Sequence, residues 1–213
     1  MENEYVITFP SNMKSDLRTF ENILKQVSNI PYDVSVIKYD ITKISWVDGE
    51  LSSFLACIFE YIQSRFKKVS QYVQLNETRS AAETLLIKNK LLPYYLPIQE
   101  IPDTYHTTVP FKNFSIYNSD KQVATKQVDD YLKKYVYSHK DWSTNFGDSQ
   151  EELDFSTSIY ELIRNIIDHS RTNKLLISGQ FYPTKEEFSL AISDIGVGIP
   201  LTVQNQTPGL RTH

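Results

Sequence analysis

The segment from Ile159 to Pro200 constrains this chain most, because it joins a helix with a polar stripe to a strand that ends in a glycine turn. Glu161, Asn165 and His169 follow one another at intervals of four residues. At about 100° per residue, the three positions drift by only about 80° around a helix and share one stripe. The apolar arc beside this stripe is formed by Ile159, Leu162, Ile163, Ile166 and Ile167. This pattern predicts a helix with one apolar face and an adjacent row of carboxylate, amide and imidazole groups.

The stripe has side chains suited to phosphate chemistry. The amide oxygen of Asn165 is a hard, neutral ligand of the kind that Mg²⁺ accepts alongside water and phosphate oxygens. Glu161, one turn earlier, can orient or deprotonate a water that attacks phosphorus. Two plainer interpretations stay open. The stripe can be a solvated helix face, or Ser158 and Glu161 can form a capping box at a helix start.

The second part of the segment reads as a strand that runs into a turn. Its alternating apolar residues are Phe188, Leu190 and Ile192. Asp194 follows in phase, where burial is costly unless the carboxylate meets a donor. Gly196 and Gly198 then permit close approach and positive φ. A carboxylate can accept a hydrogen bond from the exocyclic amine of adenine. An ordinary Asp-x-Gly turn is the alternative, whereas a dinucleotide fingerprint is excluded because Leu201 stands where the third glycine should be.

The two parts together resemble the GHKL superfamily of ATPases, which includes type II topoisomerases, ATP-driven chaperones and sensor histidine kinases. Residues 161–170 are similar to the N box of that family, and residues 193–200, which begin 24 residues after His169, are similar to its G1 box. The resemblance implies an incomplete α/β sandwich of the Bergerat type that binds ATP and Mg²⁺. It implies the cofactor-binding residues Asn165, His169, Asp194, Gly196 and Gly198, with Asn165 as the metal ligand. Glu161 is the implied catalytic carboxylate.

The chain departs from the family downstream of these boxes. A second glycine-rich box should follow a lid and close over the phosphates, and Pro208-Gly209-Leu210 is too short to supply it. We therefore expect either a fragment or a truncated nucleotide binder. Adenine recognition is the firmer expectation, and triphosphate binding and turnover the weaker one.

The first half of the chain alternates strands with helices. Strands are predicted at 5–9, 34–41 and 69–75, and helices at 17–27, 51–62 and 81–92. This order favours a small α/β layer domain with parallel strand pairing. Residues 38–48 running into the helix at Leu51 resemble, weakly, a STAS domain, whose helix start can bear a phosphorylated serine or threonine. Gly49 and Glu50 occupy that place here, and Ser52 and Ser53 are out of register, so the resemblance implies a docking module without a phosphorylation switch.

We predict a boundary between two domains, 1–93 and 111–213, with residues 94–110 as an extended connector. Four prolines mark this region: Pro93, Pro97, Pro102 and Pro110. In the second domain we expect a strand at 109–116, a helix at 118–137, the stripe-bearing helix at 149–170 and an antiparallel hairpin of strands at 174–182 and 188–194. The predicted architecture is an α+β sandwich with helices on one face of a mixed sheet.

Composition excludes several other classes of protein. The 213 residues carry a net charge of −4, which argues against a nucleic-acid binder. No apolar run reaches membrane-spanning length and no signal peptide is evident, so we expect no membrane partner. Cys57 is the single cysteine, which fits a reducing cytoplasm, and its apolar helical surroundings predict a packed rather than a reactive thiol.

These observations predict an ATP-binding regulatory or signalling protein that combines a docking domain with a histidine kinase-like ATPase module. ATP or ADP and a protein partner or a second copy of the chain are the expected ligands. Whether the protein is an enzyme stays open; ATP hydrolysis and protein serine kinase activity are the two candidate reactions. The alternative from another class is a non-enzymatic interaction protein with a vestigial nucleotide site.

Overall fold

The computed structural model describes residues 3–116, 120–143 and 146–196. Its elements follow the order β1 (Glu4–Thr8), β2 (Asn12–Met13), α1 (Leu17–Ser28), β3 (Val36–Asp40), β4 (Trp46–Val47), α2 (Leu51–Arg65), β5 (Ser70–Gln74), α3 (Ala81–Lys88), α4 (Leu91–Tyr95), β6 (Thr108–Ser115), α5 (Lys121–Leu132), the π-helix η1 (Lys133–Tyr137), α6 (Ser149–His169), β7 (Lys174–Tyr182) and β8 (Glu187–Asp194). Within these ranges, no helix has both the length and the apolar character to cross a membrane.

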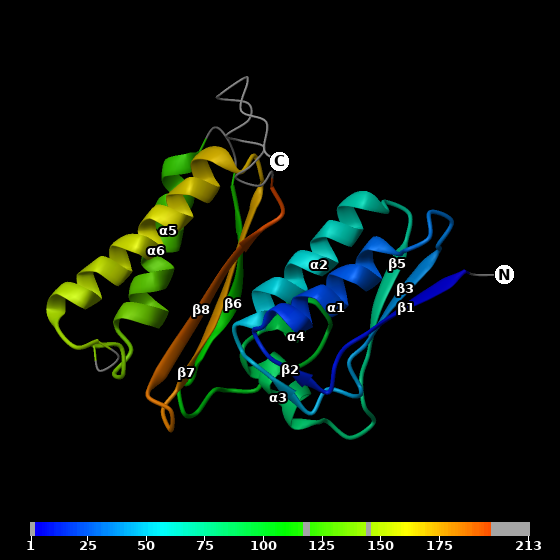
Figure 1. Cartoon of the computed structure of the whole chain (residues 1–213), viewed down its shortest axis with the longest axis horizontal. Helices are drawn as coiled ribbons and strands as arrows, with labels where there is room; N and C mark the ends of the chain where they lie inside the picture. The colour runs from blue at the N-terminus through cyan, green and yellow to red at the C-terminus, as the bar shows by residue number, and fades with distance from the viewer. Residues whose placement is uncertain (1–2, 117–119, 144–145, 197–213) are drawn as a thin grey trace.

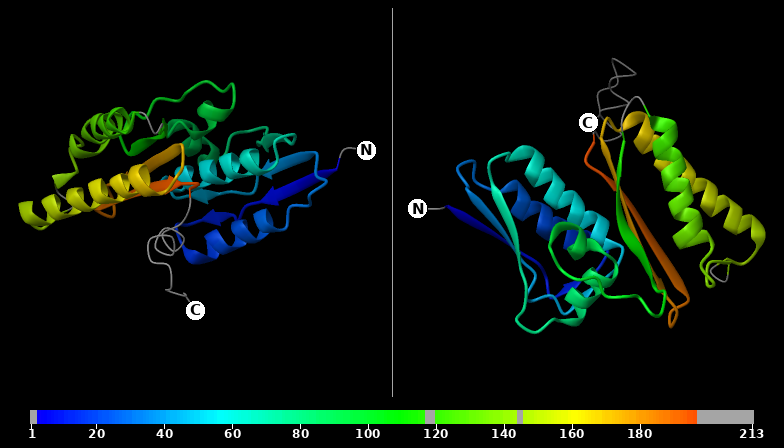
Figure 2. Two further views of the ribbon diagram at one scale, coloured as in Figure 1. Left: turned by 90° about the horizontal axis from the view of Figure 1, so that it is seen from above. Right: turned by 180° about the vertical axis from the view of Figure 1, so that it is seen from behind.

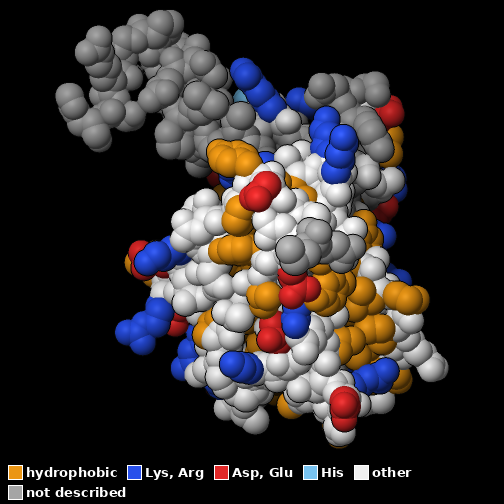
Figure 3. All heavy atoms as spheres, turned by 90° about the vertical axis from the view of Figure 1, so that its right-hand side faces the viewer, with side chains coloured by type: hydrophobic (Ala, Val, Ile, Leu, Met, Phe, Trp, Pro, Cys, Tyr) orange, Lys and Arg blue, Asp and Glu red, His pale blue; other side chains and the backbone are white. Residues whose placement is uncertain are grey.

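The first sheet has the strand order β1-β3-β5, and both of its strand pairs are parallel. This confirms the predicted alternation of strands and helices with parallel pairing. Helix α1 starts at Asp16, whose carboxylate accepts a hydrogen bond from the Thr19 N–H at 2.8 Å. The side of the molecule that lies beyond this sheet carries apolar side chains mixed with charged ones (Figure 3). Val6 and Tyr72 are among the exposed apolar residues.

The second sheet has the order β6-β7-β8, and both of its strand pairs are antiparallel. The predicted mixed sheet is therefore wrong for the described strands. The reason is that two helical segments, α5–η1 and α6, lie between β6 and β7. They return the chain to the end at which β6 finishes, where the Ile116 N–H donates to the Asn173 carbonyl at 2.8 Å. The β7–β8 hairpin is antiparallel, as predicted.

Both faces of the second sheet are covered, because alternate residues of β7 point to different helices. Leu175, Ile177 and Phe181 join the core beneath α5 and α6. Leu176 instead joins the core of the first half of the chain, and Ser178 bonds to α2. Figures 1 and 2 show the resulting layers, with α5 and α6 on one side of β6-β7-β8, α2 on the other side, and the first sheet beyond α2. The coarse fold is mixed α and β, as predicted.

The region of the predicted connector begins with a helix. Helix α4 contains Pro93 and extends to Tyr95, so residues 94 and 95 are helical where an extended connector was predicted. Proline is tolerated there because it falls in the first turn, whose N–H groups have no partner inside the helix. The predicted helix at 81–92 is interrupted at Asn89, which is fully buried and donates to the Gly49 carbonyl at 3.2 Å and to the Ser52 hydroxyl. Lys90 then adopts a positive φ of 69°.

The predicted helix at 118–137 corresponds to α5 and η1. Residue 118 lies outside the described residues, and α5 begins at Lys121. From Lys133 onward the helix widens to the π form and ends at Tyr137. The boundary between domains at 94–110 remains a prediction. The structure adds that Phe111 packs into the core of residues 7–92.

Candidate functional site

Helix α6 carries the polar stripe and begins well before it. Asp148 caps the helix by accepting hydrogen bonds from the N–H groups of Gln150 and Glu151, both at 2.9 Å. Ser158 donates its hydroxyl to the Asp154 carbonyl at 2.9 Å. A capping box at Ser158 is therefore excluded, and Glu161 lies in the body of the helix.

The stripe lies on the face of α6 that points away from the sheet. The buried residues of α6 are Ile159, Ile163 and Ile167. Glu161, Asn165 and His169 each follow one of them by two residues, which is about 200° around the helix, and all three are exposed. Leu162 was predicted to lie in the apolar arc beside the stripe. That part of the prediction is wrong, because the Leu162 side chain is 56% exposed. In the described part of the chain, no side chain hydrogen bonds to Glu161, Asn165 or His169.

Asp194 ends β8 on the face of the sheet that α6 covers. It pairs with Leu175 and shares its side of the strand with Leu190 and Ile192, which pack against the core beneath α6. The carboxylate is half-buried, and its Oδ1 accepts a hydrogen bond from the Gly196 N–H at 2.6 Å. The expected donor for Asp194 is therefore present, in a turn that the carboxylate itself closes. Among the described residues, none donates to the second oxygen, Oδ2.

Gly196 brings the turn against the end of α6. A Cβ atom at Gly196 would lie 2.0 Å from the Ser170 carbonyl oxygen and 2.8 Å from Asp194 Oδ1. The backbone of Gly196 lies outside the left-handed region, so close approach, and not positive φ, requires glycine here. Ser170 is the C-cap of α6 and directly follows His169. Gly198 lies outside the described residues.

The Asp194 turn thus meets the end of α6, the helix that carries the stripe. At about 1.5 Å of rise per residue, Asn165 lies about 6 Å and Glu161 about 12 Å along α6 from His169. His169 is the stripe residue next to the turn, and Asn165 and Glu161 follow at increasing distance. The stripe side chains and the Asp194 carboxylate nevertheless lie on different sides of α6, because the stripe points away from the sheet whereas Asp194 lies on the sheet face that α6 covers.

Helix α2 packs on the opposite face of β8. The two elements, α2 and β8, were predicted to lie in separate domains. The Ser53 and Ser193 hydroxyls lie 3.0 Å apart, and the Cys57 thiol donates to the Asp194 carbonyl at 3.6 Å. Burial, helped by the nearby charge of Asp194, raises the pKa of Cys57 to about 12. This agrees with the predicted packed thiol. The available signal was the run of small residues on one face of α2, at Ser52, Ser53, Ala56 and Cys57.

The serines at the start of α2 are structural. Ser52 and Ser53 are both fully buried. The Ser53 N–H donates to the Ser178 hydroxyl at 2.8 Å, and that hydroxyl donates to the Glu50 carbonyl at 2.7 Å. The hydroxyls of both α2 serines are therefore closed to solvent in this arrangement.

Two carboxylates, Glu50, which is buried, and Glu60, which is partly buried, connect α2 with β7. Glu50 is 7% exposed and accepts a hydrogen bond from the Tyr182 hydroxyl at 3.0 Å, and burial raises the pKa of Glu50. Glu60 forms an ion pair with Lys174 and accepts a hydrogen bond from the Tyr95 hydroxyl at 3.1 Å. These polar contacts and the serine hydroxyls hold α2 at a fixed position behind the sheet.

The residues that could hold a metal ion are few. Among the residues that the structure describes, no group of three or more histidine, cysteine, aspartate or glutamate side chains is arranged to bind a metal. Asn165 offers one exposed amide oxygen, which fits a Mg²⁺ ion whose other ligands are phosphate oxygens and water.

Comparisons with protein-family models, curated proteins and solved structures gave no match.

Proposed function

We propose that this protein is an ATP-binding regulatory protein whose nucleotide site lies where α6 meets the end of β8. Asp194 would accept a hydrogen bond from the adenine amine. Asn165 would bind the Mg²⁺ that accompanies the phosphates. The proposal rests on the resemblance to the GHKL family and on one observation, the close approach of Gly196 to the end of α6 at Ser170.

The geometry of Asp194 supports its role. Its Oδ1 is held by the Gly196 N–H, which fixes the orientation of the carboxylate. The second oxygen, Oδ2, is then the acceptor for an amine that approaches from the α6 side. A positioned acceptor loses little conformational entropy on binding, so one hydrogen bond can contribute to both affinity and base specificity.

The stripe is the proposed position of the phosphates. Asn165 and Glu161 lie progressively farther along α6 from the Asp194 turn, on the face of the helix that points away from the sheet, so a triphosphate extending from adenine would have to pass around the end of α6 to reach them. When bound, Mg²⁺ would offset phosphate charge. Glu161 would orient water or a protein hydroxyl if the intact protein hydrolyses ATP or transfers phosphate to serine.

The contacts of α2 suggest how binding is communicated. Ser53 and Cys57 touch the backbone or side chains of β8 at residues 193 and 194. A shift of the Asp194 turn would therefore change contacts of the first half of the chain. Nucleotide binding can regulate the protein only if the nucleotide binds one arrangement of these α2–β8 contacts more tightly than the other.

The experiment measures ATP and ADP binding by calorimetry, with and without Mg²⁺. We expect Asp194→Asn to weaken both nucleotides by roughly tenfold or more, the effect of losing a charge-assisted hydrogen bond. Asn165→Ala should weaken ATP only when Mg²⁺ is present. Asp168→Asn and Gln150→Ala, on the same helix, are the matched controls. Unchanged binding in Asp194→Asn would disprove the adenine assignment.

The second candidate is a non-enzymatic interaction protein with a vestigial nucleotide site. Large apolar side chains exposed on α6 favour it, namely Leu153, Phe155, Tyr160 and Leu162. If the wild-type protein binds neither ATP nor ADP, this candidate is supported. Light scattering of wild type and of Leu162→Ser then tests whether a second copy of the chain is the partner.

A further inference from the structure

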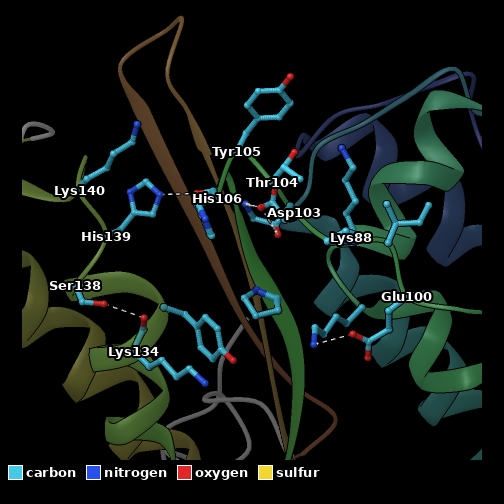
Figure 4. A pocket seen from close by; sticks show the side chains of 16 residues that line it. Lys88, Glu100, Asp103, Thr104, Tyr105, His106, Lys134, Ser138, His139 and Lys140 are labelled. Carbon is cyan, nitrogen blue, oxygen red and sulfur yellow. Dashed lines mark hydrogen bonds and ion pairs between the residues drawn. The ribbon is translucent and has the colours of Figure 1, made fainter.

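A cavity lies at the opposite end of the β6-β7-β8 sheet from Asp194. Its volume is ≈ 810 Å³, and Figure 4 shows Lys88, Asp103 and Lys134 among the residues that line it. The lining also includes Thr108, at the start of β6. Thr108 pairs with Gln180 of β7, which pairs with Ser189 of β8. Asp194 is five residues farther along β8, a separation of about 17 Å. The two regions are therefore distinct.

The lining of the cavity is positively charged in a chain of net charge −4. Four lysines, Lys88, Lys90, Lys134 and Lys140, face two carboxylates, Glu100 and Asp103. They come from the end of α3, the loop before β6, and η1 with the residues that follow it, so chain segments far apart in the sequence contribute to one charged cavity. Field lines focused in a concave site attract anions more strongly than scattered surface charges do.

Both carboxylates are already engaged. Glu100 pairs with Lys90 at 2.9 Å. Asp103 accepts hydrogen bonds through Oδ2 from the Thr108 N–H at 2.7 Å and from its hydroxyl at 2.8 Å. In the described part of the chain, Lys88, Lys134 and Lys140 have no acidic partner. The ammonium of Lys134 lies 4.8 Å from the centre of the Tyr135 ring. Three cations therefore remain for an anionic ligand.

The wall of the cavity is held in place by His139. Its ring stacks on Phe181 with centroids 3.6 Å apart and planes inclined by 10°. Its Nδ1 accepts from the Asp141 N–H at 3.1 Å, so Nε2 carries the proton and donates to the His106 carbonyl at 2.5 Å. The loop that carries His106 is thus tied to the segment that carries Lys140. A preformed wall reduces the ordering cost of binding.

Asp103 favours a ligand that carries a hydrogen-bond donor. Its Oδ1 is buried and has no hydrogen-bond partner among the described residues. A buried acceptor without a donor is costly, and a ligand hydroxyl that reached it after a small movement of the loop would relieve that cost. The cavity volume falls within the range of about 300–1,000 Å³ that is typical of small-molecule sites.

We propose that this cavity binds a small phosphorylated ligand, with Lys88, Lys134 and Lys140 on the phosphates and Asp103 on a hydroxyl group. This site is independent of the nucleotide site proposed at Asp194. The protein would then have two ligand sites, one at each end of the same sheet.

The test uses tripolyphosphate and ribose 5-phosphate as probes, with calorimetry on the full chain at two salt concentrations. We expect Lys134→Gln and Lys88→Gln each to weaken tripolyphosphate binding by roughly tenfold and to flatten its salt dependence. Lys133→Gln is the matched control. Lys133 directly precedes Lys134 in η1, but its ammonium group pairs with Asp129 at 2.6 Å and it does not line the cavity. Asp103→Asn should weaken ribose 5-phosphate and leave tripolyphosphate unchanged.

Three results would overturn the proposal. One is a wild-type protein that binds neither probe at low millimolar concentration. Another is a loss of binding in Lys133→Gln as large as that in Lys134→Gln. Asp194→Asn separates the two sites, since it should leave tripolyphosphate binding intact. If Asp194→Asn abolishes tripolyphosphate binding while Lys134→Gln does not, the anion binds at the nucleotide site and this proposal fails.

Discussion

Replacing Tyr182 with phenylalanine tests the polar contact between α2 and the second sheet. The hydroxyl of Tyr182 donates to Glu50 Oε2 at 3.0 Å and accepts from the Gly49 N–H at 3.3 Å. Tyr182 is 9% exposed and Glu50 is 7% exposed, so water cannot readily replace the lost donor. Tyr182→Phe removes the oxygen atom and leaves the packing of the ring unchanged.

The expected loss at pH 7 is about 2 kcal/mol, because a hydrogen bond to a charged group contributes roughly 1.5–3 kcal/mol. Tyr131→Phe is the control. The Tyr131 hydroxyl is also buried, but it donates to the neutral Pro110 carbonyl at 2.5 Å. That substitution should cost about 1 kcal/mol. The difference between the two variants reports the charge on Glu50.

The cost of Tyr182→Phe should depend on pH. Burial raises the pKa of Glu50 above its ordinary value of 4.5. A carboxyl whose pKa is higher in the folded state destabilises the fold as pH rises from 4.5 through the folded pKa. The Tyr182 hydroxyl opposes this shift by stabilising the ionised form. The loss caused by Tyr182→Phe should therefore grow over this pH range, whereas that of Tyr131→Phe should stay constant.

Urea unfolding at pH 4.0, 5.5 and 7.0 measures these values. The buried Trp142 is a suitable fluorescent reporter. Glu50→Gln removes the titrating group, so Tyr182→Phe in that background should cost about the same at every pH. Equal losses for Tyr182→Phe and Tyr131→Phe at all three pH values would refute the reasoning.

Two further predictions concern the Asp194 turn and the thiol behind it. Gly196→Ala should destabilise the protein by roughly 1–3 kcal/mol in urea unfolding, since its methyl group would collide with the Ser170 carbonyl. At Gly147 the added carbon would meet only the movable Glu151 carboxylate, at 3.0 Å, so an equal loss in Gly147→Ala would contradict the steric explanation. Because burial raises the pKa of Cys57 to about 12, its alkylation at pH 8 should be roughly 1,000-fold slower in the folded than in the urea-unfolded chain, and should accelerate between pH 9 and pH 11. Similar rates in the two states would show that the thiol is accessible.

Local pattern was sufficient for most of the elements. The helical spacing at Leu51, Leu55, Ile58 and Ile62 corresponds to buried positions of α2, and the alternation at Phe188, Leu190 and Ile192 corresponds to one face of β8. The failures arose where a distant residue decides local structure. Asn89 interrupts a good helical pattern because its side chain bonds to Gly49 and Ser52, which lie far away in the sequence.

The candidate site was predictable in its residues more than in its arrangement. The stripe of Glu161, Asn165 and His169 could be read from spacing, but its orientation depends on which isoleucines face the sheet. Two reasons for glycine at position 196 were predicted, positive φ and close approach. The structure bears out only the close approach, to the Ser170 carbonyl, because the backbone of Gly196 lies outside the left-handed region. The contact of Cys57 with Asp194 joins two halves of the chain, so no local pattern could indicate it.

The two-sided burial of α2 restricts how the chain can evolve. Its small residues, Ser52, Ser53 and Ala56, are fully buried, and Ala56 belongs to the same core as the first sheet. Enlarging any of them would force the helix away from one of its two neighbours, so compensating changes would be needed on whichever sheet was displaced. Substitutions in the amino-terminal half that move α2 should therefore be accompanied by compensating substitutions in β7 and β8.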